Sequence, residues 1–253
     1  MSGTLAAGPA PVASRRLALA GEALAARGGL VFVAVALFVF LTAPLAAILI
    51  RAIQDKDGAY VGLANFAQYF ASPAFSRSAG NTLTFALVTT FLTVPLAFGF
   101  AYAIQRSCIR AKWLWRNIAL VPILAPSLLA ALSFIYLFGN QGILKAVLPW
   151  FGLTTIYGLP GMVLSMTFSA FPHAVMILLA SLSLSDARLY EAADSLATSE
   201  WRKFVTITLP GARYGLVSAA MVVFTMAVSE FGVPKVIGGN YNVLAIDVYK
   251  QVI

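Results

Sequence analysis

The sequence predicts an all-α polytopic membrane protein. Hydrophobic residues fill 60% of its 253 positions and charged residues only 10%, a balance that soluble domains do not have. Mean hydropathy is +0.88. Apolar stretches long enough to cross a bilayer as helices recur along the chain, separated by connections that carry most of the charge. Five membrane spans are predicted from this pattern.

The first span is predicted at residues 28–50. Residues 1–27 are rich in Ala, Gly and Pro and include three arginines, so we expect a disordered cytoplasmic tail there. A cleaved signal peptide is the alternative interpretation. The run from 28 to 50 contains 23 uncharged residues, which is longer than the core of a signal peptide and favours a retained span.

Three further spans are predicted before the charged segment that follows residue 184. They cover residues 81–104, 118–138 and 161–184. We expect Pro122 and Pro126 to interrupt the third span, because proline removes a helical hydrogen bond and crowds the preceding turn. For the same reason Pro172 is expected to break the fourth span beside His173, the only histidine.

The fifth span is predicted at residues 214–229, and residues 231–253 are polar enough to form a loop that turns at Gly238-Gly239-Asn240. Five spans that start from an inner N-terminus place Ile253 outside the membrane. Because no closing helix follows, we expect the chain to be truncated or to be the first half of a longer polypeptide.

The distribution of basic residues predicts the orientation. With the N-terminus inside, the inner segments hold 11 of the 17 basic residues and the outer segments hold 6, as expected when positive charge favours the cytoplasmic side. Residues 185–213 then face the cytoplasm. The net charge of +8 does not indicate nucleic-acid binding, because the basic residues flank apolar runs and therefore suit contact with membrane lipid.

An amphipathic segment, residues 190–210, stands out between the fourth and fifth spans. Small and apolar residues recur at helical spacing here and predict one face of a helix. They are Leu189, which directly precedes the segment, and Ala192, Ala193 and Leu196. We expect a break near 197–199, a second short helix capped by Ser199, and a stop or kink at Pro210. A helix with a small-residue face suits docking of a cytoplasmic partner.

The spacing within this segment is similar to the EAA loop of bacterial ABC importer permeases. The matching residues are Glu191, Ala192, Ala193, Ala197, Ile207, Leu209 and Pro210. The family has Gly where this chain has Ala197, and a backbone with positive φ is harder to form there with Ala. A generic charged loop between two spans is the alternative interpretation.

This resemblance implies a type I ABC importer transmembrane domain over residues 77–253, incomplete at its C-terminus. It also implies that the EAA residues form a coupling helix for a separate ATP-binding subunit. The expected further partners are a periplasmic solute-binding protein and a second permease unit, which could be fused, identical or distinct. The expected location is the bacterial inner membrane.

The last residues, from Glu230 to Gln251, resemble the iron(III) and 2-aminoethylphosphonate branch of this family. The resemblance implies that the transported solute is an anion or a metal chelate. Ferric iron and 2-aminoethylphosphonate are then the leading candidates.

The chain is not expected to be an enzyme or to hold a cofactor or metal. It lacks the G-x-x-x-x-G-K-[ST] phosphate loop, so ATP would be bound by the partner subunit. It also shows no paired carboxylates, His–Cys cluster or nucleophile elbow. A membrane-embedded enzyme or scaffold is therefore not favoured. An ion-gradient-driven secondary transporter is the main rival. It would need intramembrane acids or broken helices at a midplane site, and the near absence of acids from the spans counts against it.

Polar residues within or beside the spans are candidates for a translocation pathway, because such groups usually face a cavity or a partner. They are Ser165, Ser169, His173, Ser229 and Glu230. Alternatively, His173 bonds a carbonyl freed by Pro172, Glu230 ends the fifth span, and the serines serve close helix packing.

Overall fold

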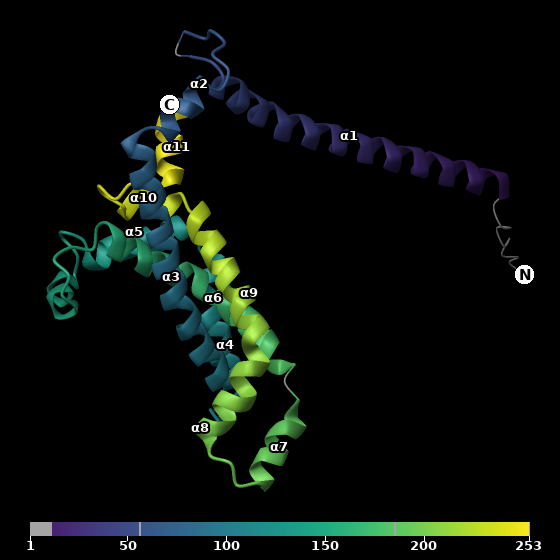
Figure 1. Ribbon diagram of the computed structural model, residues 1–253. Helices are drawn as coiled ribbons and strands as arrows, with labels where there is room; N and C mark the ends of the chain where they lie inside the picture. The colour runs from purple at the N-terminus through teal and green to yellow at the C-terminus, as the bar shows by residue number, and fades with distance from the viewer. Residues whose placement is uncertain (1–11, 56, 185, 253) are drawn as a thin grey trace, which may run out of the picture. The chain divides into compact units, whose positions relative to one another are not determined.

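The computed structural model describes residues 12–55, 57–184 and 186–252, and these form helices and one isolated β-bridge between Gln54 and Tyr60. The described residues divide into two compact units, 12–68 together with residue 252, and 69–251. Figure 1 shows the helices of both units. The predicted all-α fold is confirmed.

The first unit consists of α1 (Val12–Ala52) and most of α2 (Ala64–Phe70). The stretch Ala26–Ala52 is long and apolar enough to cross a membrane, and none of its residues is buried against the chain itself. The predicted first span lies within it. The tail expected at 1–27 is helical from Val12 onward, so the prediction of disorder is wrong there; residues 1–11 lie outside the described residues.

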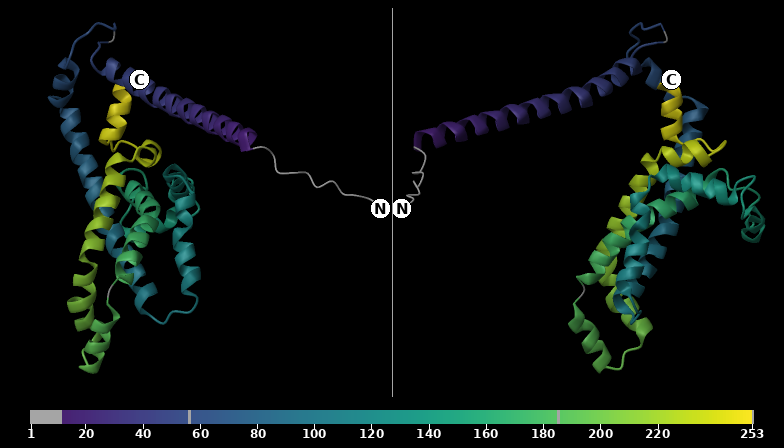
Figure 2. Two further views of the ribbon diagram at one scale, coloured as in Figure 1. Left: turned by 90° about the vertical axis from the view of Figure 1, so that its right-hand side faces the viewer. Right: turned by 180° about the vertical axis from the view of Figure 1, so that it is seen from behind.

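The second unit is built around three long helices, α3 (Pro73–Arg106), α6 (Leu159–Ser183) and α9 (Leu209–Ser229), which pack against one another (Figures 1 and 2). Lipid tails are as apolar as leucine, so packing rather than the hydrophobic effect holds such helices together, and small residues allow close approach. The small residues buried in the three helices include Ala86, Ala97, Ala101, Ala170, Ala174, Ala212, Gly215 and Ala219.

Proline interrupts these long helices less than the sequence predicted. Pro95 lies inside α3 and Pro172 inside α6, and both helices are continuous. The expected break at Pro172 is therefore wrong. Pro172 is buried in the bundle; proline is tolerated inside membrane helices when the surrounding structure satisfies the backbone groups that it frees.

The predicted third span is a bent pair of helices. The first arm contains α4 (Lys112–Leu120) and the 3₁₀ turn η1 (Val121–Leu124), and the second arm is α5 (Ser127–Phe138), turned by 99°. At the corner, Ala125 and Pro126 are both extended, with ψ of 133° and 146°. For Ala125 this is expected, because a residue that precedes proline avoids the helical region. Among the described residues four helices can cross a membrane, or five if this pair counts as one span.

The segment predicted as a polar outer loop contains two short helices, α10 (Gly232–Ile237) and α11 (Leu244–Val252). Side chains of α3 hold it: the Leu244 N–H donates to Thr82 Oγ1 over 2.8 Å, and Asn81 Nδ2 donates to the Asn242 carbonyl over 2.8 Å. The loop prediction is therefore wrong, although the glycine turn is present, with Gly239 at φ 56°.

The two ends of this bundle differ. The helices α10 and α11 lie at the end where α3 begins, whereas α7 (Ala187–Ser195) and α8 (Glu200–Lys203) lie at the opposite end (Figure 2). A second 3₁₀ helix, η2 (Lys145–Phe151), lies in the connection between α5 and α6.

Candidate coupling surface

The amphipathic segment forms a helix, a break and a second helix at one end of the bundle (Figure 1). Asp186 caps α7, since its carboxylate accepts the Arg188 N–H over 2.9 Å; an acid at this position also stabilises the positive end of the helix dipole. Ser199 occupies the cap position of α8, as predicted, but its side chain makes no capping hydrogen bond. We call residues 186–210 the coupling segment.

The seven EAA-pattern residues fall into two groups within the coupling segment. On α7, Glu191 and Ala192 are exposed and Ala193 is buried, while Ala197 lies in the following turn. Near the start of α9, Ile207 is half-buried and both Leu209 and Pro210 are exposed. A groove of about 350 Å³ lies between α7 and the start of α9; Leu189 of α7 lines it, and Ile207 is the one EAA-pattern residue in its lining.

The turn after α7 places a left-handed residue at position 197, where the EAA pattern has glycine. The Thr198 N–H donates to the Ala193 carbonyl over 3.0 Å, and the Ala197 N–H donates to the Asp194 carbonyl over 2.9 Å. This pair of bonds is a Schellman motif, whose first residue beyond the helix cap takes a left-handed conformation. Ala197 does so at φ 51°, despite the steric cost that the sequence suggested.

Replacing Ala197 with Gly is expected to stabilise the protein by about 1 kcal/mol, because glycine adopts positive φ without a Cβ clash. Thermal unfolding of the purified protein should show a rise of a few degrees. The matched control is Ala192→Gly within α7, which should lower stability by a similar amount because glycine is a poor helix former. A lower unfolding temperature for Ala197→Gly would contradict the assigned turn.

An ion-pair cluster joins the two short helices. Lys203 of α8 lies within hydrogen-bond distance of the Asp194 carboxylate at the end of α7, and its ammonium group is 2.5 Å from a Glu200 carboxylate oxygen. Lys203 is 8% exposed, whereas the side chains of Asp194 and Glu200 are 61% and 83% exposed. Lys203 therefore links the end of α7 to α8 across the break.

The helix that enters the bundle does not stop at Pro210. Residues Glu200–Ser229 form one continuous helical rod, in which α8 passes through the π-helical turn η3 (Phe204–Thr208) into α9. Pro210 lies in the first turn of α9, directly after the wider π turn. The predicted stop at Pro210 is wrong, and the fifth span begins earlier than residue 214.

Tyr190 was not recognised from the sequence, although it anchors the coupling segment. Its hydroxyl lies 2.8 Å from Thr208 Oγ1 in η3, and its ring lies under the Arg106 guanidinium, with 3.8 Å between Cζ and the ring centroid. Arg106 is the last residue of α3. A tyrosine that precedes an acid in an amphipathic segment is the only local signal, and the sequence contains nothing that pairs it with Arg106.

The five candidate pathway residues lie on two helices. Ser165 and Ser169 are buried in α6, and His173 is half-buried with its Nδ1 3.3 Å from the Ser169 carbonyl. Ser229 is exposed at the end of α9, where its hydroxyl donates to the Thr225 carbonyl over 2.8 Å. The hydrogen bonds of the described residues do not link the α6 group to the α9 group.

Glu230 holds a corner of the fold. One of its carboxylate oxygens accepts from the Ser127 hydroxyl of α5 over 2.8 Å and from the Val233 N–H of α10 over 3.1 Å. Glu230 is also the cap residue that ends α9. The carboxylate therefore fastens the second arm of the bent pair to the junction of α9 and α10.

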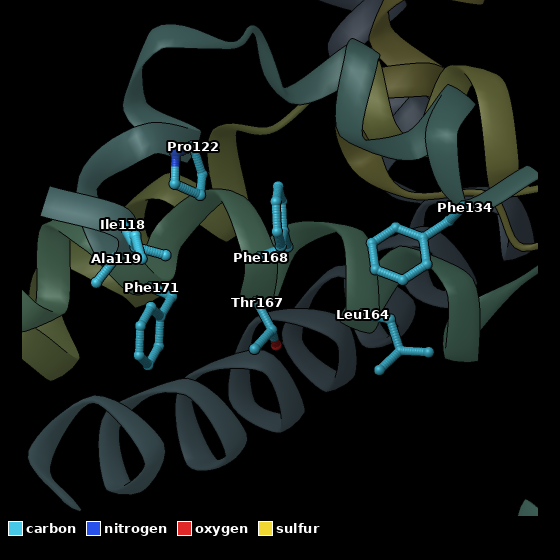
Figure 3. Close-up of a pocket in the computed structure, with 8 residues that line it drawn as sticks. All are labelled: Ile118, Ala119, Pro122, Phe134, Leu164, Thr167, Phe168 and Phe171. Atoms are coloured by element: carbon cyan, nitrogen blue, oxygen red, sulfur yellow. The ribbon is translucent and has the colours of Figure 1, made fainter. Parts of the chain in front are cut away.

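An apolar groove of about 390 Å³ lies beside the bent pair (Figure 3). Thr167 supplies the one hydroxyl in its lining, and that hydroxyl lies 3.2 Å from the hydroxyl of Thr93. The other lining residues are Ile118, Ala119, Pro122, Phe134, Leu164, Phe168 and Phe171. The groove contains no candidate pathway residue.

These features define a class of protein. Three long apolar helices pack into one core, and an EAA-pattern helix–break–helix lies at one end of it, as in the membrane subunits of ABC importers. The chain belongs to the family described as "Binding-protein-dependent transport system inner membrane component", whose model matches residues 93–250. The prediction of this family from the EAA pattern is confirmed.

Solved structures support the same fold. A bacterial ABC transporter involved in the import of the acidic polysaccharide alginate matches with a TM-score of 0.64 and 16% identity, covering 94% of this chain and 96% of that chain. The alginate transporter in complex with its alginate-bound periplasmic protein matches with a TM-score of 0.61 and 17% identity, covering 92% of both chains.

Curated relatives share more sequence over shorter stretches. Sulfate permease 2, chloroplastic, of Chlamydomonas reinhardtii is 31% identical over 183 residues, which is 71% of this chain and 48% of that protein. The molybdenum transport system permease protein ModB of Haemophilus influenzae is 31% identical over 60% of this chain and 66% of that protein. The ferric transport system permease protein FbpB of Actinobacillus pleuropneumoniae is 24% identical over 88% of this chain and 33% of that protein. The matched regions therefore span only a third to two thirds of these relatives.

Proposed function

We propose that this chain is the permease subunit of an ATP-driven bacterial importer and moves a small solute across the inner membrane. The observation that carries the proposal is the EAA pattern on an exposed helix–break–helix whose side chains tie it to the membrane helices. A separate subunit binds and hydrolyses ATP, a periplasmic protein delivers the solute, and a second permease unit completes the pathway. The N-terminus lies in the cytoplasm.

The coupling segment offers the kind of surface that a cytoplasmic subunit would cover. Apolar side chains are exposed along it, including Leu189 at 55%, Leu196 at 80% and Trp201 at 73%. Glu191 is exposed on α7, the helix that carries Leu189. Exposed apolar residues that are ringed by charges are typical of a protein-binding site.

We propose an anion or a metal chelate as the solute. The relatives named for sulfate, molybdenum and ferric transport support this class. Ferric iron and 2-aminoethylphosphonate are the two candidates from the C-terminal resemblance. One of the relatives reported above is named for ferric transport, and none of them is named for 2-aminoethylphosphonate. The ion-gradient alternative has no support from the family match.

Reversing the charge of Glu191 tests the proposed docking. The tagged chain is purified from native membranes in mild detergent, and the ABC ATP-binding subunit that accompanies it is quantified by mass spectrometry. We expect Glu191→Arg to reduce its recovery by about tenfold or more, because a like-charge contact in an interface costs at least about 1.4 kcal/mol.

The control is Asp57→Arg, an equal change of charge at an exposed position that we predict to lie on the other side of the membrane. It should leave recovery of the ATP-binding subunit unchanged. If no such subunit accompanies the wild-type chain, the importer proposal fails and a gradient-driven carrier is favoured. Equal recovery with Glu191→Arg would show that the docking surface lies elsewhere.

A further inference from the structure

Tyr190 connects the coupling helix to two helices of the bundle at once. Its hydroxyl bonds Thr208 at the base of α9, and its ring lies against Arg106 at the end of α3. We propose that Tyr190 is the residue that passes movement of α7 to α3 and α9. This inference rests on the proposed function, in which an ATP-binding subunit moves α7.

Tyr190 is the partner that holds Arg106. Arg106 is half-buried, its Nε is buried without a hydrogen bond, and no carboxylate of the described residues lies within ion-pair distance of it. The guanidinium is instead held by the aromatic ring, and such a contact is stronger when the cation is partly removed from water. The position of the α3 terminus is therefore coupled to the position of Tyr190.

The other polar link of α7 reaches only the α8–α9 rod. Asp194 pairs with Lys203, which belongs to α8 and so to the same continuous rod as α9. Within the described residues, the hydrogen bonds, ion pairs and cation–π contacts give α7 only one route to α3, which is Tyr190. Removing the Tyr190 side chain therefore breaks the link from α7 to α3 and leaves the Asp194–Lys203 link from α7 to the α8–α9 rod.

The second contact of Tyr190 is with the least regular part of the rod. Thr208 is fully buried and is the last residue of the π turn η3. In the same turn, Phe204 packs edge-on against Tyr102 of α3, with ring centroids 5.3 Å apart. π turns are rare and recur at functional sites, and here the turn lies where α3, α7 and α9 meet.

The native cysteine allows a direct test. Cys108 is the only cysteine of the chain, is exposed, and lies two residues after Arg106. An environment-sensitive fluorophore on Cys108 reports on the end of α3 after assembly with a cysteine-free form of the ATP-binding subunit. Trapping the assembled complex with ATP and vanadate should change the emission of the wild-type protein.

Tyr190→Leu is expected to reduce this emission change by about fivefold or more, as for loss of a typical coupling between sites, while the ATP-binding subunit stays bound. Tyr190→Phe and Thr208→Val remove only the hydroxyl contact and should reduce the change by a smaller, similar factor. The matched control is Tyr214→Leu. Tyr214 is exposed, and its ring also contacts an arginine. That arginine is its neighbour Arg213 in the same helix, so the contact does not link two elements.

Two results would overturn the inference while the importer proposal stands. One is a wild-type response in Tyr190→Leu with the ATP-binding subunit bound; if that variant does not assemble, a wild-type response in Arg106→Gln, which removes the guanidinium over the Tyr190 ring, decides the matter in the same way. The other is a trapped wild-type complex whose Cys108 emission does not change, because α3 then receives no movement. Failure of the wild-type chain to bind an ATP-binding subunit would instead overturn the proposed function itself.

Discussion

Gly215→Leu is expected to prevent the protein from folding. A Cβ atom built on Gly215 of α9 would lie 2.3 Å from both Cβ and Oγ of Ser181 in α6. Ser181 Cβ is bonded to the backbone and cannot rotate away, so the two helices would have to separate. Overpacking a helix contact usually costs about 1–3 kcal/mol, and we expect a larger loss here because the clash is with a fixed atom.

The measurement is size-exclusion chromatography of the detergent-extracted protein, followed by thermal unfolding of any monodisperse fraction. Gly99→Leu is the matched control, because Gly99 lies inside α3 and nothing is within 4 Å of its added Cβ. Ser181→Gly removes both clashing atoms and should partly restore Gly215→Leu. A monodisperse Gly215→Leu protein with unchanged unfolding temperature would contradict the close contact of α6 and α9.

Hydropathy and one spaced motif were enough to predict much of this fold. Membrane spans follow from apolar length alone. The predicted second span therefore falls inside α3, and the predicted fourth span falls inside α6 except for its last residue. The break after α7 was also predicted, because Ala197 and Ser199 follow an amphipathic repeat. These are local properties, which depend on residues a few positions apart.

Contacts between distant residues could not be predicted in this way. Arg106 and Tyr190 are far apart in the chain and meet only because α3, α6 and α9 pack as a bundle. The same limit explains the error at 231–253, where side chains of α3 hold α11 in place. A polar composition indicates that a segment is exposed to water. It does not show that a buried hydroxyl elsewhere in the chain accepts a hydrogen bond from the segment's backbone N–H.

The candidate pathway shows a further limit. Polar residues within apolar spans are easily found, but their direction depends on helix packing that hydropathy does not encode. Ser165 is fully buried between helices, and its hydroxyl makes no hydrogen bond among the described residues. Thr89 of α3 is in the same situation. The role of the candidate residues in transport therefore stays a prediction.

Glu230→Ala is expected to lower stability by about 2–3 kcal/mol, because hydrogen bonds to a charged group contribute about 1.5–3 kcal/mol and the Val233 N–H would lose its partner. The same substitution removes the acceptor of the Ser127 hydroxyl, which fastens α5 beside α10. Unfolding free energies measured in detergent by denaturant titration should show this loss. Hydrogen exchange should also rise in Gly232–Ile237.

Glu230→Gln distinguishes the contribution of the Glu230 hydrogen bonds to stability from the contribution of its negative charge. The amide keeps a carbonyl oxygen at the position that accepts from Ser127 and Val233, so we expect stability within about 1 kcal/mol of the wild type. A double-mutant cycle of Glu230→Ala with Ser127→Ala should give a coupling of about 1 kcal/mol, as expected for groups in direct contact. If Glu230→Gln is as unstable as Glu230→Ala, the negative charge rather than the hydrogen bonds holds the corner. That result would strengthen the case for Glu230 as an ionised group of the translocation pathway.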